Sequence, residues 1–322
     1  MITVSNITKQ YGGFTAVKDV SFSVDRDQVL GFLGPNGAGK TTVMKILTGY
    51  HFPTSGTALI DGVSVMEEPV EVKKRIGYLP ESVPVYGELT VDEYLTFIAR
   101  ARLIPKATRK GAKQRAVEAC GLGSVTGKKI ETLSKGYKQR VGLAQAIVHD
   151  PAILILDEPT AGLDPNQIIE IRSLIKELGK SKTVILSTHI LQEVEAVCSQ
   201  VLIINEGKIA AYGTAAEIAA SLKRTDAWEL RLIPPQDMDE ETVRVKIATG
   251  MGESRIEKKA DFSEINGKRV VDLTFSAQSA ESAYLMDGET IFDWVASSGF
   301  KIIGMNKKKV SLEDIFVKLT KE

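Results

Sequence analysis

The sequence predicts an α/β fold: a mostly parallel core sheet with an N-terminal antiparallel sheet and a helical subdomain, followed by a small α+β domain. Three observations predict it. A short apolar strand at residues 29–33 runs through a glycine-rich loop into a helical stretch. Residues 152–156 and 183–186 are continuous apolar runs with helical patterns between and after them, typical of buried parallel strands. After Lys223 the pattern changes to alternating strands.

Length and composition exclude several classes of protein. The chain has 322 residues, 43% of them hydrophobic and 25% charged, enough for two globular domains. Lys and Arg number 41, and Asp and Glu also number 41, so no excess of positive charge indicates nucleic-acid binding. Cys120 and Cys198 are too few for a disulfide framework, and we expect both to pack as small apolar side chains.

The N-terminus begins with strand-like alternation and not with the basic and apolar segments of a signal peptide. A membrane-spanning helix needs about 20 consecutive apolar residues, whereas the strongest apolar run, residues 152–156, has only the length of a strand. We therefore expect the protein to stay inside the cell and to reach a membrane only through a partner.

The elements follow in order along the chain. Residues 2–24 alternate as two strands of an antiparallel sheet, and residues 82–150 are mainly helical. Residues 201–204 form a strand that ends in a hairpin turn at residues 205–208. We expect one domain at residues 1–224, with its helical subdomain at about 82–150. A small α+β domain at residues 225–322 is compatible with a ferredoxin-like sandwich.

The glycine-rich loop carries the first chemical site. Residues 34–41 read GPNGAGKT, which matches the phosphate-binding pattern GxxxxGK[ST] between a strand and a helix. Glycines let successive N–H groups face one anion, and the helix adds the positive end of its dipole. Lys40 should reach the β- and γ-phosphates, and the Thr41 hydroxyl should bind Mg²⁺. The predicted phosphate-binding residues are Gly34, Pro35, Asn36, Gly37, Ala38, Gly39, Lys40, Thr41 and Thr42.

A second site lies at the end of the buried strand at residues 153–156, which stops abruptly at Asp157 and Glu158. Two acids at this place are costly without a cation nearby. Because adjacent strand residues face opposite ways, Asp157 can bind Mg²⁺ while Glu158 faces an attacking water. A solvated acid pair at a strand end, or a glycine turn that only caps a helix, would explain each site alone but not both together.

A third motif narrows the family. Residues 133–140 read LSKGYKQR and precede a helical run, so a serine hydroxyl and a glycine amide start a helix and form a second anion site. The motif resembles the signature of ABC transporter ATP-binding subunits, usually written LSGGQ, and lies between the two nucleotide motifs. The resemblance covers residues 1–224 strongly. It implies that Ser134 and Gly136 of one subunit close over ATP held by the loop of another.

The same resemblance implies roles for four further residues. Tyr11 lies where an aromatic ring stacks on adenine, and Asp164 belongs to a loop that crosses the subunit boundary. His189 resembles the switch histidine that contacts the γ-phosphate and positions the water. Glu81 stands where the family usually has glutamine, and we expect it to act as a metal ligand and catalytic residue. His51 and His149 lack such a context, and we expect both at the surface.

Together these motifs imply an ATPase that uses ATP and Mg²⁺, with Lys40, Glu158 and His189 at the reacting phosphate. The resemblance implies a homodimer that drives separately encoded integral membrane permease subunits from the cytoplasmic face of the membrane. Lys135 and Tyr137 replace the usual glycine and glutamine of the signature. This variation is similar to that of exporter ATPases of the multidrug and gliding-motility-associated type, and it favours export. Two alternatives are a superfamily member acting on ribosomes or DNA, and a nucleotide-sensing module without turnover.

Overall fold

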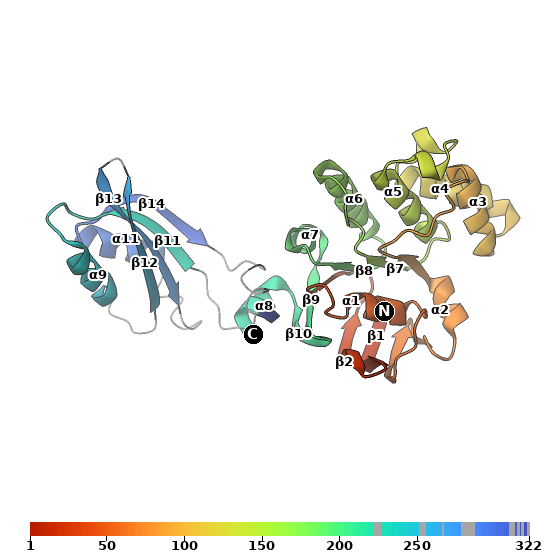
Figure 1. Ribbon diagram of the computed structural model, residues 1–322, viewed down its shortest axis with the longest axis horizontal. Helices are drawn as coiled ribbons and strands as arrows, with labels where there is room; N and C mark the ends of the chain where they lie inside the picture. Colours follow the sequence, from red (N-terminus) through yellow and green to blue (C-terminus); the bar gives the residue numbers. More distant parts are fainter. Residues whose placement is uncertain are drawn as a thin grey trace. The chain divides into compact units, whose positions relative to one another are not determined.

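The computed structural model describes residues 1–221, 227–250, 256–265, 267–277 and 287–308, with residues 313, 316, 319 and 320. The chain divides into two compact units: Met1–Thr214 with Leu319–Glu322, and Ala215–Lys318 (Figure 1). The predicted boundary between residues 224 and 225 lies outside the described residues. The assignment of the two predicted domains therefore stays a prediction.

The first unit begins with the antiparallel sheet that the alternation predicts. Its strand order is β2-β1-β4-β5, and Ile2 pairs with Val24 on one side and with Ile60 on the other. These three side chains are fully buried in one core cluster. The strands are β1 (Ile2–Tyr11), β2 (Phe14–Val24), β4 (Ser55–Ile60) and β5 (Val63–Ser64).

The second sheet is the predicted parallel core, with strand order β10-β9-β3-β8-β7-β6. Five of its strands pair in parallel, and only β10 runs antiparallel, to β9. Ile153 and Ile155 belong to a core cluster with residues of the antiparallel sheet and of the helix at residues 40–47. Leu154 and Leu156 belong to a second cluster formed largely with helices, so both faces of β7 are buried. The strands are β3 (Val29–Leu33), β6 (Ile76–Leu79), β7 (Ile153–Asp157), β8 (Thr183–Thr188), β9 (Gln200–Asn205) and β10 (Lys208–Gly213).

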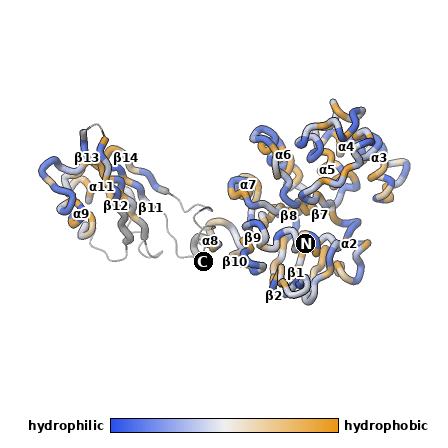
Figure 2. Tube along the Cα trace, viewed as in Figure 1, coloured by the Kyte–Doolittle hydropathy of each residue, from blue (hydrophilic) through white to orange (hydrophobic). Residues whose placement is uncertain are grey.

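Helices cover the parallel sheet, and their traces mix hydrophobic and hydrophilic residues, as an amphipathic helix requires (Figure 2). In α3 the buried residues are Val91, Tyr94, Leu95 and Ala99, and the helix begins with a capping box between Thr90 and Glu93. The helices are α1 (Lys40–Leu47), α2 (Pro69–Arg75), α3 (Val91–Ala101), α4 (Lys106–Ala119), α5 (Lys135–Ile147), α6 (Pro165–Leu178) and α7 (Leu191–Val197), with short 3-10 turns at Gly123–Val125 and Ile130–Thr132.

Strand β6 and helix α5 lie close together at Gly77. A Cβ added to Gly77 would lie 2.2 Å from the carbonyl oxygen of Ala146. Because that atom is backbone, the helix and the sheet would have to separate, and we expect Gly77→Ala to lower the free energy of unfolding by about 1–3 kcal/mol. Urea unfolding measures this loss. Gly127→Ala is the control, since its Cβ would meet nothing within 4 Å, and equal midpoints for both variants would contradict the prediction.

The second unit contains a four-stranded sheet with order β12-β13-β11-β14 and antiparallel pairing throughout. The chain order β11-α9-β12-β13-α11-β14 is typical of a ferredoxin-like sandwich. Both helices contribute to the cluster formed by alternate residues of β11 and β13. The elements are α8 (Ala215–Ser221), β11 (Ala227–Ile233), α9 (Glu240–Thr249), β12 (Ile256–Ile265), β13 (Lys268–Ala277), α11 (Gly288–Ser297) and β14 (Lys301–Lys308).

Within the described part of the chain, every helix is too short or too polar to cross a bilayer.

Candidate functional site

The glycine-rich loop lies between β3 and α1, at the carboxyl end of a central strand. Gly39 has a φ of 108°, and a Cβ there would lie 2.7 Å from the carbonyl oxygen of Ala16, so both backbone conformation and space require glycine. Gly39 is also the N-cap of α1 and offers no side chain to the first helical N–H groups. This end of the helix is suited to an anion.

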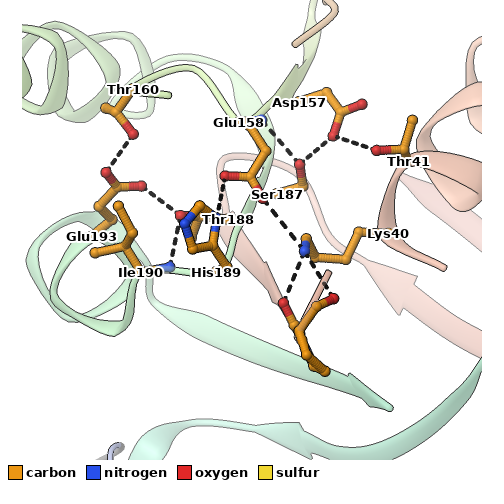
Figure 3. A network of polar contacts seen from close by, with 12 residues as sticks. Lys40, Thr41, Asp157, Glu158, Thr160, Ser187, Thr188, His189, Ile190 and Glu193 are labelled. Atoms are coloured by element: carbon orange, nitrogen blue, oxygen red, sulfur yellow. Dashed lines mark hydrogen bonds and ion pairs between the residues drawn. The ribbon is translucent and has the colours of Figure 1, made fainter. Parts of the chain in front are cut away.

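Lys40, the first residue of α1, is held inside the loop with only 6% of its surface exposed. Its Nζ donates to the carbonyl oxygens of Gly34 at 2.8 Å and Pro35 at 3.2 Å, and lies 3.4 Å from Oε1 of Glu158 (Figure 3). The ammonium group is therefore fixed beside the open end of α1. It can supply the positive charge that a phosphate group needs.

Asp157 ends β7 and is 1% exposed. Its Oδ1 accepts hydrogen bonds from Ser187 Oγ at 2.5 Å and Thr41 Oγ1 at 3.3 Å, whereas Oδ2 is buried and has no hydrogen-bond partner among the described residues. Burial raises the pKa of the carboxyl group, and the two hydroxyl groups act in the opposite direction. A buried carboxylate oxygen without a partner, beside a hydroxyl, fits a hard cation such as Mg²⁺.

Glu158 follows Asp157 with a φ of 48°, a left-handed conformation in which its N–H donates to the Ser187 carbonyl at 3.1 Å. This turn directs the side chain away from Asp157 and toward two cationic or polar groups. Glu158 Oε2 lies 2.9 Å from Nδ1 of His189, while Oε1 faces Lys40 (Figure 3). The carboxylate is thus held between the loop lysine and the histidine that follows β8, with 6% of its surface exposed.

Lys40, Thr41, Glu158 and His189 line one cavity of about 450 Å³, a size within the range of small-molecule sites. Tyr11, 43% exposed, forms part of the wall, with the Lys9 ammonium 5.1 Å from its ring centroid. Most of the predicted site residues therefore share one cavity. Its lining comprises Tyr11, Phe14, Ala16, Asn36, Gly37, Gly39, Lys40, Thr41, Thr42, Glu81, Glu158, Ala161 and His189.

Seven predicted site residues do not line this cavity. Gly34, Pro35 and Ala38 belong to the glycine-rich loop itself, and Asp157 ends β7 beside it. The other three are Ser134, Gly136 and Asp164, at the starts of α5 and α6. The Ser134 hydroxyl caps α5 by accepting from the N–H of Tyr137 at 3.4 Å, and Gly136 is buried in the first turn of α5. Asp164 caps α6 by accepting from the N–H of Gln167 at 3.0 Å. Ser134 and Asp164 are exposed, so one chain presents two separate surfaces with anion-binding features.

Four polar residues behind the cavity were missed by sequence reasoning: Thr160, Ser187, Thr188 and Glu193. Ser187 bridges the two acids, because its Oγ donates to Asp157 and accepts from the N–H of Glu158. A signal existed for Ser187 and Thr188, since two hydroxyl residues end a buried strand beside the acids. Nothing in the sequence indicated that Glu193, on an ordinary amphipathic helix, is buried.

His51 and His149, which we expected at the surface, are both partly buried. His149 lies at the end of α5, where its Nε2 contacts the carbonyl oxygen of Ile76 at 3.0 Å. Burial, followed by the nearby positive charge of Arg102, lowers the pKa of His149 from 6.5 to about 4. The imidazole is therefore neutral in the folded protein near pH 7.

This lowered pKa predicts an acid-sensitive contribution to stability. A group whose pKa is lower in the folded state stabilises the fold above its unfolded value, and that contribution is lost as pH falls toward the folded value. We expect the free energy of unfolding to decrease between pH 6.5 and pH 4, and less steeply in His149→Gln. Urea unfolding across this range measures both slopes. Identical slopes would contradict the prediction.

Comparison with known proteins identifies relatives of the chain. Residues 17–161 match a family model described as ABC transporter, and residues 128–195 match one described as AAA domain, putative AbiEii toxin, Type IV TA system. The ABC transporter ATP-binding protein YxlF of Bacillus subtilis is 33% identical over 319 residues, 99% of each chain. The bacitracin transport ATP-binding protein BcrA of Enterococcus faecalis is 31% identical over 322 residues, 99% of this chain and 96% of the relative.

Solved structures give the same relationship. A structure described as the ATP binding subunit of an ABC transporter is 30% identical, with a TM-score of 0.63, over 69% of this chain and 93% of that one. A dimeric bacterial ABC transporter cassette, 24% identical, has a TM-score of 0.61 over 66% of this chain and 98% of that one. The second likeness shows the fold alone. Both confirm the predicted α/β architecture.

Proposed function

This chain belongs to the family of ABC transporter ATP-binding proteins, and we propose that two copies of it enclose two Mg·ATP and drive separately encoded membrane subunits. It is an ATP-binding ATPase subunit. The proposal rests on one observation: a single chain presents two separate surfaces that suit phosphate. The cavity beside Lys40 and the helix start at Ser134 both suit phosphate, yet Ser134 does not line that cavity. A second copy could bring them together.

We assign the phosphate contacts to the loop at residues 34–39, Lys40 and Thr42. Lys40 is fixed by the Gly34 and Pro35 carbonyl oxygens, which limits the entropy that it would lose on binding a phosphate. Tyr11 lies in the same cavity wall and offers a ring face for stacking on adenine. We propose that Ser134, Gly136 and Asp164 contact the ATP that is bound by the partner copy. Ser134 and Asp164 are exposed N-cap residues, and Gly136 lies in the first turn of α5.

Thr41, Asp157 and Glu81 are the proposed residues for Mg²⁺. Thr41 and Asp157 already contact each other, and the unpartnered Oδ2 of Asp157 fits a cation. Mg²⁺ is usually bound through one or two carboxylates together with substrate phosphates and waters, so phosphate oxygens and waters would complete the coordination here. When bound, the ion would neutralise negative charge on the phosphates.

Glu158 is the proposed general base, and His189 the proposed group that holds the water and the γ-phosphate in line. The two side chains contact each other at 2.9 Å, and both line the cavity. Lys40 lies 3.4 Å from Glu158, and a carboxylate at this position can accept a proton from water. The three residues can therefore prepare water for attack on a phosphate held by the loop.

The membrane partner is proposed to dock beside Glu81. Glu81 lines the cavity, and the following segment, residues 83–89, carries Tyr86, which is 58% exposed and in edge contact with the exposed ring of Phe97. Exposed aromatic side chains of this kind often mark an interface. This placement would make the protein peripheral on the cytoplasmic face of the membrane. We propose that transport runs in the export direction, because the signature resembles that of exporter ATPases. We also propose an accessory role for residues 225–322.

Three measurements test the function. Purified protein with Mg·ATP should release phosphate, and ATP should shift the protein toward a dimer in size-exclusion chromatography. In cells, an affinity-tagged chain should co-purify with an integral membrane protein after detergent extraction. ATP hydrolysis without any ATP-dependent dimer or membrane partner would contradict the proposed assembly.

A further inference from the structure

A buried carboxylate lies behind the candidate site, on a residue to which neither the cavity nor the motifs assign a role. Glu193, on the short helix α7, is 1% exposed. Its Oε1 accepts a hydrogen bond from Thr160 Oγ1, and its Oε2 accepts one from Thr188 Oγ1 at 2.7 Å (Figure 3). One side chain therefore joins two loops that come from different strands.

Each of these loops carries a residue of the proposed chemistry. Thr160 lies two residues after Glu158, on the loop that follows β7, and Thr188 directly precedes His189 at the end of β8. Thr188 Oγ1 also accepts from the N–H of Ile190 at 3.0 Å. The backbone on both sides of His189 is thus tied to one threonine, and that threonine is tied to Glu193.

A purely structural role would not require an acid here. Burying a carboxylate costs free energy unless its oxygens are hydrogen-bonded, and an apolar residue of similar size would fill the same space without that cost. Arg172 Nη2 lies 3.9 Å from Oε1, and this longer ion pair compensates part of the charge. The two hydroxyl bonds are directional, and they define the distance between the two loops.

We propose that Glu193 is a positioning residue for ATP hydrolysis. By holding Thr160 and Thr188, it fixes the loop of Glu158 against the loop of His189 and so maintains the 2.9 Å contact between them. This inference rests on the proposed roles of Glu158 and His189. Glu193 does not line the cavity, and its hydrogen bonds go to Thr160 and Thr188, so its effect concerns the reaction step and not nucleotide binding.

The test is a double-mutant cycle on purified full-length protein, with steady-state phosphate release as the readout. Glu193→Gln retains the shape of the side chain but replaces one acceptor oxygen with an amide group. We expect kcat to fall about tenfold while KM for ATP changes less than twofold. In a His189→Ala background the same substitution should lower kcat less than twofold further, because the residue through which it acts is gone.

Two further variants complete the experiment. Thr188→Val removes the hydroxyl group that donates to Glu193 and leaves Glu193 itself unsubstituted. Alone it should reproduce the fall in kcat, and combined with Glu193→Gln it should lower kcat little further. Glu195→Gln, on the same helix but exposed, should leave kcat unchanged. Equal losses from Glu193→Gln in both backgrounds, or a rise in KM that accounts for the whole effect, would overturn the positioning role.

The cycle also separates this proposal from the function on which it rests. If His189→Ala hydrolyses ATP at the parental rate, the role proposed for His189 is wrong, and the positioning role fails with it. If His189→Ala is slow and Glu193→Gln retains the parental kcat, only the positioning role is wrong. If circular dichroism shows that Glu193→Gln folds poorly, the kcat of Thr188→Val decides between these outcomes instead.

Discussion

Glu158→Gln is expected to lower the rate of ATP hydrolysis by about 10²–10⁴-fold, the usual contribution of general-base assistance. The amide has the shape of the carboxylate but accepts a proton poorly. ATP binding should persist, because the glycine loop, Lys40 and Thr41 remain, and because one negative charge near the phosphates is removed. ATP-bound dimers should therefore accumulate in this variant.

Phosphate release under saturating Mg·ATP measures the rate, and size-exclusion chromatography with ATP measures the dimer. Glu177→Gln is the control, since Glu177 is an exposed residue of α6 that pairs with Lys180, and it should hydrolyse ATP at the parental rate. Hydrolysis at the parental rate by Glu158→Gln would disprove the base role. A loss of ATP binding in the same variant would instead assign Glu158 to nucleotide binding.

Lys40→Ala should weaken ATP binding by about 10–100-fold, the loss expected when one charge-assisted hydrogen bond of about 1.5–3 kcal/mol is removed. The substitution also leaves Glu158, 6% exposed, without its cation at 3.4 Å. An uncompensated carboxylate beside the triphosphate would repel it further. The fall in affinity should therefore exceed the fall that the loss of a single neutral hydrogen bond would cause.

Titration with a fluorescent ATP analogue measures the affinity of Lys40→Ala. Lys45→Ala is the matched control on the same helix, because the Lys45 ammonium lies 6.0 Å from the Tyr50 ring centroid and Lys45 does not line the cavity. Its affinity should remain within twofold of the parental value. Unchanged affinity of Lys40→Ala would place the phosphates elsewhere and would contradict the whole assignment of the cavity.

Much of the candidate site could be predicted from short stretches of sequence. The loop at residues 34–41 and the signature at residues 133–140 each lie within about eight consecutive residues. Such segments are recognisable because the chemistry depends on local backbone geometry: glycine where φ is positive, and a hydroxyl group at a helix start. The parallel sheet was predictable for a similar reason, since strands buried on both faces must be continuously apolar.

The contacts that join these segments could not be predicted in the same way. Thr41 meets Asp157 across 116 positions of sequence, and Glu158 meets His189 across 31. Both contacts depend on strand order, which places β8 between β3 and β7. The burial of Glu193 and His149 depends equally on neighbours from other elements, so their sequence contexts look like those of surface residues.

By itself, the sequence determined the family and the ATPase chemistry. It also predicted the loop, acid and signature residues, because each lies in a contiguous motif with one local geometry. Only the tertiary structure decided which side chains meet. The parallel sheet brings the ends of β3, β7 and β8 to one edge, where Lys40, Glu158 and His189 share a cavity and Glu193 joins the loops behind it. Such contacts depend on distance in space, which no local pattern specifies.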